Sequence, residues 1–329
     1  MMRHANTALH GRARTGRSAR RSLFHLMYAT TILLSTLGGK PARASVEHKA
    51  SDRASHSATA SMLRISPDGW GRTSMDDLRV LLEAVMAELA PRFPHREFVA
   101  IRVVHGDGGP LAFYDKSADG EYVVRLSAQH SRWHQFVYQF AHELCHIYSN
   151  FDNKPATDGR IEHHNNQWFE ESVCETAALY TLRKLAQRWE SDPPGPQFAG
   201  QGATLQALAD YLINEPHRHL PPSRPLASWF KANQPHLEES PYLRDKNEVV
   251  ANLMLPLFEQ APEAMSAIGY MNLRTEDADR QFGDYLRAWH DACPEDKRGV
   301  VQRIIALFEG KDAGSFPTSS PTQLARAAN

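Results

Sequence analysis

Apolar side chains recur every three or four residues between Trp133 and Ile147, which is the spacing of one face of an α-helix. The same segment also has a row of polar residues spaced four, three and four positions apart, namely Gln135, Gln139, His142 and His146. Residues four apart lie on the same face of a helix. We therefore predict a largely buried helix with one polar stripe.

The same reasoning predicts other helices and two strands. Ser74 is suited to cap a helix whose apolar stripe ends at Pro91. Two runs rich in β-branched residues, 98–104 and 121–126, predict strands on either side of a Gly-rich loop. The remaining helical patterns cover 167–189, 203–213, 225–233, 245–259, 262–270, 276–290 and 295–309. This order predicts an α+β fold with a small sheet and an α-helical C-terminal subdomain.

The run from Glu121 to Leu126 admits two positions in that sheet. As an edge strand above a cleft, it could pair with an extended peptide by strand addition. As a core strand, it would be paired on both sides. The pattern alone leaves both open.

The first 44 residues have the three regions of a secretory signal peptide. Eight Lys or Arg and no acidic residue precede Ala44, an uncharged apolar run extends from Leu23 to Leu37, and the small-residue triplet Ala42-Arg43-Ala44 follows. We predict cleavage after Ala44 and a secreted or periplasmic mature chain. The apolar run is short for a membrane span, so a retained anchor is the less favoured alternative.

Beyond the leader, composition divides the chain. Residues 45–61 and 311–329 are polar or rich in small residues and predict a flexible linker and a disordered tail. Between them we predict a core over 62–190 and a helical subdomain over 203–310. Without the leader, 37 − 8 = 29 basic residues face 38 acidic ones, a net charge of −9 with His neutral. This charge does not favour nucleic acid or an anionic membrane as a partner.

The polar stripe of the helix at 133–147 contains candidate metal chemistry. His142, Glu143 and His146 form the HExxH pattern, in which two imidazoles one turn apart can bind one metal ion beside a glutamate. A catalytic zinc site has three protein ligands and one open position. The pattern therefore predicts Zn²⁺ and requires a third ligand from elsewhere in the chain.

The first turns of the next helix carry three glutamates, and among them Glu171 is our prediction for this third ligand. Glu175, one turn further on, could accept the free N–H of His142 and fix its tautomer. Glu170 and Glu175 are alternative ligands. Asp152 is another, because it stands six residues after His146, as the third ligand does in metzincin-like proteins. Ser149 departs from that resemblance, since those proteins have Gly at this position to turn under the metal.

These residues resemble the gluzincins, the thermolysin and aminopeptidase N group of zinc metallopeptidases. In thermolysin-like members the glutamate ligand is followed four residues later by an acid that binds the first histidine, and in the aminopeptidases it lies three residues after a tryptophan. Both patterns occur in this chain, as Trp168-Phe169-Glu170-Glu171 and Glu171-Ser-Val-Cys-Glu175. Ser172 stands where the aminopeptidases carry Gly. The resemblance covers about 50 residues and implies a zincin-like core of helix, small sheet, HExxH helix and Glu helix.

The implied function is an exported zinc metallopeptidase that hydrolyses peptide or protein substrates. Glu143 would act as general base for attack by a zinc-bound water. The alternative is a zincin-fold scaffold that binds metal or a partner without catalysis. For the second donor to the oxyanion, the candidates are Tyr242 and His236, and Arg244 is a candidate for substrate binding.

Three cysteines make an odd count in a chain that is predicted to be exported. Cys145 lies within the HExxH pattern and Cys174 lies three residues after Glu171, so the two thiols would be on neighbouring elements. They could form a disulfide, or each could be a small buried side chain.

Overall fold

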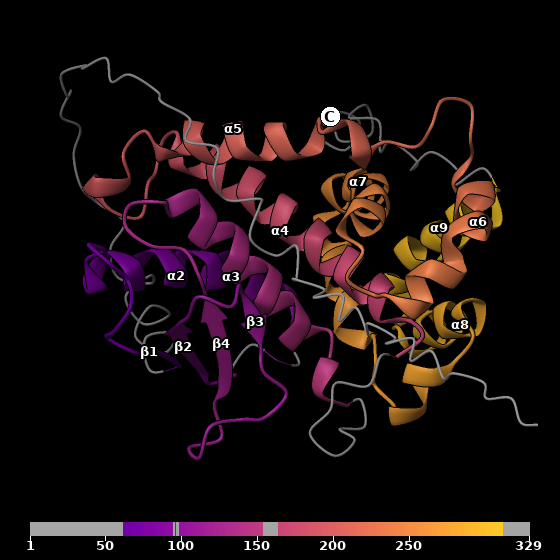
Figure 1. Cartoon of the computed structure of the whole chain (residues 1–329), viewed down its shortest axis with the longest axis horizontal. Helices are drawn as coiled ribbons and strands as arrows, with labels where there is room; N and C mark the ends of the chain where they lie inside the picture. Colours follow the sequence, from indigo (N-terminus) through magenta and orange to yellow (C-terminus); the bar gives the residue numbers. More distant parts are fainter. Residues whose placement is uncertain (1–61, 95, 97–98, 154–163, 312–329) are drawn as a thin grey trace, which may run out of the picture. The chain divides into compact units, whose positions relative to one another are not determined.

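The computed structural model describes residues 62–94, 96, 99–153 and 164–311 (Figure 1). All of them belong to one compact unit, His48–Asn329. The predicted signal peptide, the linker and the tail beyond Lys311 lie outside the described residues. Within the described part, no helix combines the length and apolar character needed to cross a bilayer.

Helices make up most of the described chain. The α-helices are α2 (Met75–Leu89), α3 (Trp133–Tyr148), α4 (Gln167–Trp189), α5 (Gln201–Ile213), α6 (Leu226–Glu239), α7 (Arg244–Gln260), α8 (Phe282–Ala292) and α9 (Arg298–Glu309). The 3₁₀ helices are η2 (Ala90–Arg92), η3 (Phe151–Asn153), η4 (Pro196–Phe198), η5 (Pro216–Arg218), η6 (Pro262–Tyr270), η7 (Thr275–Asp279) and η8 (Glu295–Lys297). Together with a small sheet, they confirm the α+β class.

The sheet has four strands in the order β1-β2-β4-β3, namely Leu63–Ile65, Ile101–His105, Tyr122–Leu126 and Leu111–Ala112. β1, β2 and β4 are parallel, and β3 is antiparallel to β4. β4 therefore lies inside the sheet, and the edge-strand interpretation of the run at 121–126 was wrong. The edge is β3, a two-residue strand that is too short to produce an alternating pattern in the sequence.

The core positions α3 against the sheet. α2 begins with a hydrogen bond from the Asp77 amide to the Ser74 side chain, a cap of the kind that stabilises a helix by about 1 kcal/mol. α2 packs against α3, and α3 contacts β3 and β4 (Figure 1). The apolar row of α3 is fully buried at Phe136, Phe140 and Leu144. This burial leaves the polar stripe of α3 to face another element.

That element is α4, which packs along α3 and also contacts α5 and α7. α4 is buried on nearly every side, so it has apolar residues around most of its circumference. At its first turn, Trp168 and Phe169 pack against aromatic rings of three later helices, Phe230 of α6, Phe282 of α8 and Phe308 of α9. Burying aromatic side chains of this size contributes strongly to stability. The C-terminal helices thereby hold the start of α4 in place.

The C-terminal helices follow the predicted ranges with four differences. α6 continues through Pro235 to Glu239, beyond the predicted end at 233. The segment 262–270 is a 3₁₀ helix, η6, that begins at Pro262. The predicted helix 276–290 is split into η7 and α8, and the one at 295–309 begins with the short η8. Periodicity alone distinguishes poorly between α and 3₁₀ spacing in short segments, because both repeat every three to four residues.

Candidate metal centre

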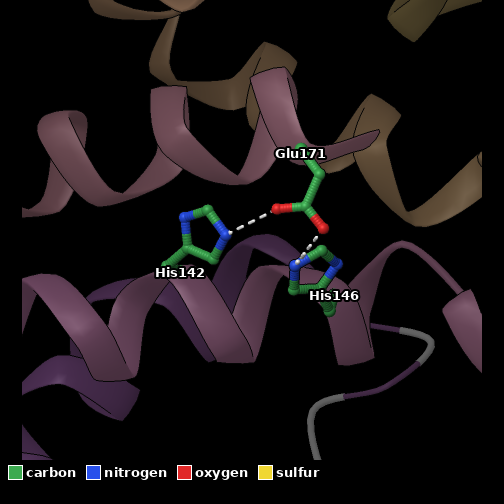
Figure 2. A group of neighbouring side chains, drawn as sticks. All are labelled: His142, His146 and Glu171. Atoms are coloured by element: carbon green, nitrogen blue, oxygen red, sulfur yellow. Dashed lines mark hydrogen bonds and ion pairs between the residues drawn. The ribbon is translucent and has the colours of Figure 1, made fainter. Parts of the chain in front are cut away.

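Three side chains from α3 and α4 converge on one point (Figure 2). The candidate ligand atoms of His142, His146 and Glu171 all lie within 4.8 Å of one another. Glu171 Oε2 lies 3.3 Å from His142 Nε2, and Glu171 Oε1 lies 3.6 Å from His146 Nε2. The two histidines are one turn apart on the same face of α3, as the polar stripe predicted.

The charges of these groups depend on each other. Burial lowers the pKa of His142, but the carboxylates of Glu171 and Glu175 outweigh it and raise the pKa to about 9. Burial likewise lowers the pKa of His146, yet Glu171 and Glu170 raise it well above its ordinary value. Burial raises the pKa of Glu171, and the two imidazoles lower it strongly overall. A metal ion at this point would replace protons on both histidines.

Each imidazole also has a carboxylate behind it. His146 Nδ1 lies 2.8 Å from Glu170 Oε1, and His142 Nδ1 lies 3.8 Å from Glu175 Oε2. A carboxylate at Nδ1 fixes the tautomer in which Nε2 carries no proton and can bind a metal. Two neutral imidazoles and one carboxylate, each imidazole oriented in this way, suit Zn²⁺. The residues therefore fit the predicted cofactor.

The position of Glu170 behind His146 was not predicted from the sequence, which suggested Glu170 only as an alternative ligand. Its second oxygen accepts a hydrogen bond from Asn272 Nδ2 at 2.8 Å, and Tyr285 donates to Asn272 Oδ1 at 2.9 Å. Asn272 lies 102 residues further along the chain. No local pattern could have connected the two.

Glu143 lies beside the ligands and against the outer edge of the sheet. Burial raises its pKa, whereas His142, His146 and the backbone amide of Ala112 in β3 lower it. Since Phe113 N–H pairs with β4, its neighbour Ala112 directs its N–H away from β4. The carboxylate of Glu143 therefore lies near the outer edge of β3, which among the described residues pairs only with β4.

Two tyrosines face the same acidic group. Burial raises the pKa of Tyr242, and so do Glu171, Glu170 and Glu143. Burial and Glu170 raise the pKa of Tyr114, which the sequence analysis did not select. Gln167, at the start of α4, lowers the pKa of Tyr114 and donates to Tyr242 Oη at 3.4 Å. Both phenols are therefore protonated donors near neutral pH.

Other predicted residues lie further from the ligands. The Arg244 guanidinium donates to Glu248 Oε1 at 3.1 Å and to Tyr138 Oη at 3.0 Å, so it reaches the centre through Tyr138. His236 is exposed near the end of α6. Asp152 accepts a hydrogen bond from Tyr122 at 2.7 Å and pairs with Arg96 at 3.4 Å. These contacts explain why Asp152 is not part of the ligand group.

The cysteines and Ser172 are buried around the site. Cys145 and Cys174 are free, buried thiols, and burial together with Cys145 raises the pKa of Cys174. They are therefore small buried side chains on neighbouring helices, as one of the two interpretations expected. The Ser172 hydroxyl donates to the Trp168 carbonyl one turn earlier at 2.9 Å. The Ser172 hydroxyl is therefore paired although it is fully buried.

In the described part of the chain, a second group of three side chains could hold a cation, and it consists of Glu215, His217 and Glu248. His217 Nε2 lies 2.6 Å from Glu248 Oε2. Both carboxylates are already paired with Arg218, at 3.4 Å for Glu215 and 2.9 Å for Glu248. An arginine therefore supplies the positive charge that a cation would bring.

We expect Glu170→Gln and Glu175→Gln each to weaken zinc binding by about 10–100-fold, because each removes the carboxylate that orients one imidazole. Competition titration against a chromophoric chelator measures the change. Glu190→Gln, an exposed acid after the end of α4, is the matched control and should bind zinc like the wild type. If Glu175 were itself a ligand, its replacement would abolish tight binding, and Glu171→Gln would have the milder effect.

A scan of the chain against protein-family models and a search of curated proteins both gave no match. The chemistry of the site therefore has to be argued from its own geometry.

Proposed function

We propose that this chain is an exported zinc-dependent metallopeptidase with a zincin-like, gluzincin-type core. The observation that carries the proposal is the convergence of His142, His146 and Glu171, with a carboxylate at Nδ1 of each imidazole. Two histidines and one glutamate form the ligand set of zinc peptidases that leave a coordination position open. Export follows from the leader pattern at residues 1–44.

Glu143 is suited to move the proton during hydrolysis. Zinc held by the three ligands would polarise the scissile carbonyl and make water more acidic. The Glu143 carboxylate takes the proton of the attacking water and passes it to the nitrogen of the leaving amine. Its raised pKa supports this role, because a carboxylate with higher proton affinity is the stronger base.

The oxyanion that forms on the scissile carbonyl needs a hydrogen-bond donor besides the cofactor. Tyr242 and Tyr114 are both suited to donate, since their raised pKa values keep the phenols protonated. Gln167 joins them. Tyr114 is therefore a candidate beside Tyr242 for this catalytic role.

An extended peptide substrate is suited to the outer edge of β3, which among the described residues pairs only with β4. The outer face of β3 presents backbone groups next to Glu143, where an extended chain could pair by strand addition. The mature net charge of −9, from 29 basic and 38 acidic residues, argues against nucleic acid as a ligand. We propose peptide or protein substrates and no stable membrane association after cleavage of the leader.

The test uses the mature chain from Ser45, purified with zinc and assayed on casein and a peptide library. We expect about one bound zinc ion per chain and hydrolysis that a chelator stops and added zinc restores. Zinc binding without hydrolysis of any library member would favour the scaffold alternative. Hydrolysis that persists after complete removal of the metal would contradict the proposal.

A further inference from the structure

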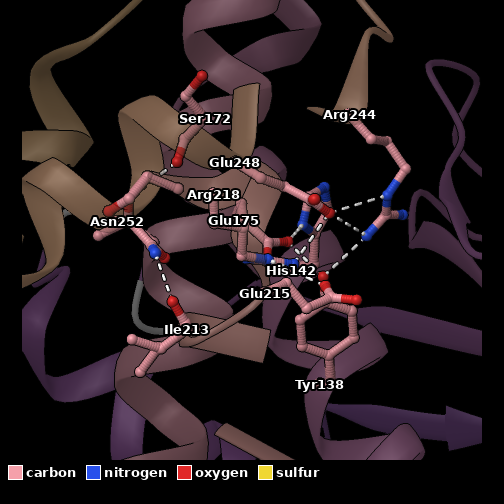
Figure 3. Close-up of polar contacts among 12 residues, drawn as sticks. Tyr138, His142, Ser172, Glu175, Ile213, Glu215, Arg218, Arg244, Glu248 and Asn252 are labelled. Carbon is pink, nitrogen blue, oxygen red and sulfur yellow. Dashed lines mark hydrogen bonds and ion pairs between the residues drawn. The ribbon is translucent and has the colours of Figure 1, made fainter. Parts of the chain in front are cut away.

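A closed ring of five polar side chains lies behind the candidate metal centre (Figure 3). It connects four elements, and its members are Tyr138 of α3, Glu175 of α4, Arg218 of η5, and Arg244 and Glu248 of α7. Arg218 is its innermost member, with a side chain that is 0% exposed. A charge buried in this way is retained only where opposite charges and hydrogen bonds compensate for lost water.

Two glutamates of the ring balance the buried positive charge of Arg218. Its Nη1 donates to Glu175 Oε1 at 2.7 Å, and its Nη2 lies 2.9 Å from Glu248 Oε1. Outside the ring, its Nε donates to Glu215 Oε2 at 3.4 Å. Two arginines and two glutamates balance the ring itself, so neither glutamate is left as an unpaired buried anion.

Within the ring, the two oxygens of Glu175 have different partners. Oε1 accepts from Arg218, whereas Oε2 accepts a hydrogen bond from the Tyr138 hydroxyl and faces His142 Nδ1. Tyr138 in turn accepts from Arg244 Nη2 at 3.0 Å, and Arg244 pairs with Glu248. The ring therefore fixes which oxygen of Glu175 is directed at the imidazole.

We propose that Arg218 is a positioning residue of the metal centre, which acts on His142 through Glu175. The inference rests on the proposed function for the identity of the metal, and it adds that η5 and α7 set the orientation of a ligand carried by α3. Without Arg218, the buried Glu175 loses its strongest counter-charge. The carboxylate is then no longer held at Oε1 by the guanidinium, at 2.7 Å in the wild type, and can turn away from His142.

The experiment is a double-mutant cycle between Arg218→Met and Glu175→Gln, with zinc affinity as the readout. Each single variant should weaken zinc by about 10–100-fold. If Arg218 acts through Glu175, Arg218→Met should have little further effect in the Glu175→Gln background, because coupled residues are not additive. Additive losses, or an unchanged affinity in Arg218→Met, would overturn the proposal.

A matched control separates positioning from general loss of a buried ion pair. Arg92→Met breaks the pair with the buried Glu88 at 2.5 Å, outside the ring, and should leave zinc affinity unchanged. The absorption spectrum of the Co²⁺-substituted protein should change in Arg218→Met and stay constant in Arg92→Met. A spectrum that responds equally to both substitutions would contradict a positioning role.

Arg218→Lys should recover part of the affinity, since it restores the charge. If Arg218→Met does not fold, Tyr138→Phe tests the same ring, since it removes the hydrogen bond to Glu175 Oε2 and should also be non-additive with Glu175→Gln. Wild-type protein that binds no zinc would defeat the proposed function as well. If the wild type binds zinc but the losses of affinity in the two variants are additive, only the proposed role of the ring is wrong.

Discussion

Glu143→Gln should lower peptide hydrolysis by about 10²–10⁴-fold, the usual contribution of a general base, while one zinc ion stays bound. The reason is geometric. Glu143 does not belong to the group formed by His142, His146 and Glu171, so removing its charge leaves the ligands intact. The amide of glutamine occupies nearly the same space as the carboxylate but cannot accept the proton of water. Turnover of a library peptide and metal content, measured on the same preparation, check this prediction.

Glu190→Gln serves as the control for this prediction, since it makes the same chemical change at an exposed position. It should keep wild-type turnover. If wild type and Glu143→Gln are indistinguishable across a broad substrate screen, the chain is a scaffold that binds metal without catalysis. Loss of zinc from Glu143→Gln would instead mean that this carboxylate holds the metal.

The second large effect is expected from the double variant His142→Ala, His146→Ala, which should lose the stoichiometric zinc completely. It removes two of three candidate ligands, so the loss should exceed the about 100-fold effect of removing an orienting carboxylate. Metal analysis after gel filtration measures the outcome. Full retention of zinc would eliminate the proposed centre.

The wild type provides an independent check on the same centre through pH. Without metal, neighbouring carboxylates raise the pKa of His142 to about 9 and raise the pKa of His146 above its ordinary value, so each imidazole holds its proton more tightly than a free histidine does. Zinc must displace these protons, and its affinity should therefore rise with pH until about pH 9. His219→Ala, His236→Ala replaces two exposed histidines and should retain this dependence. A pH-independent affinity would contradict the ligand assignment.

The sequence predicted the elements that carry the candidate ligands well, because periodic burial determines them. The apolar rows of α3 and α4 are long and continuous, so the position of His142, His146 and Glu171 on facing helices follows from local spacing. β3 was missed, since two residues cannot show alternation. The linker, the leader and the tail lie outside the described residues and stay predictions.

The surroundings of the ligands could not be predicted in the same way. Asn272 reaches Glu170, and Arg218 reaches Glu175, over 102 and 43 residues of chain. Such contacts depend on the packing of the C-terminal helices rather than on any local pattern. Tyr114 was missed because it follows a short strand in an irregular segment.

The long-range contact between Glu170 and Asn272 also bears on when the centre can form during synthesis. A nascent chain that extends to Trp189 already contains His142, His146 and Glu171. It lacks Arg218 and Asn272, which hold the carboxylates behind both imidazoles, and it lacks Tyr285, which holds Asn272. Arg218, which contacts the carboxylate behind His142, is thus synthesised before Asn272, which contacts the carboxylate behind His146. The full set of side chains around the candidate centre is therefore present only once the chain extends to Tyr285.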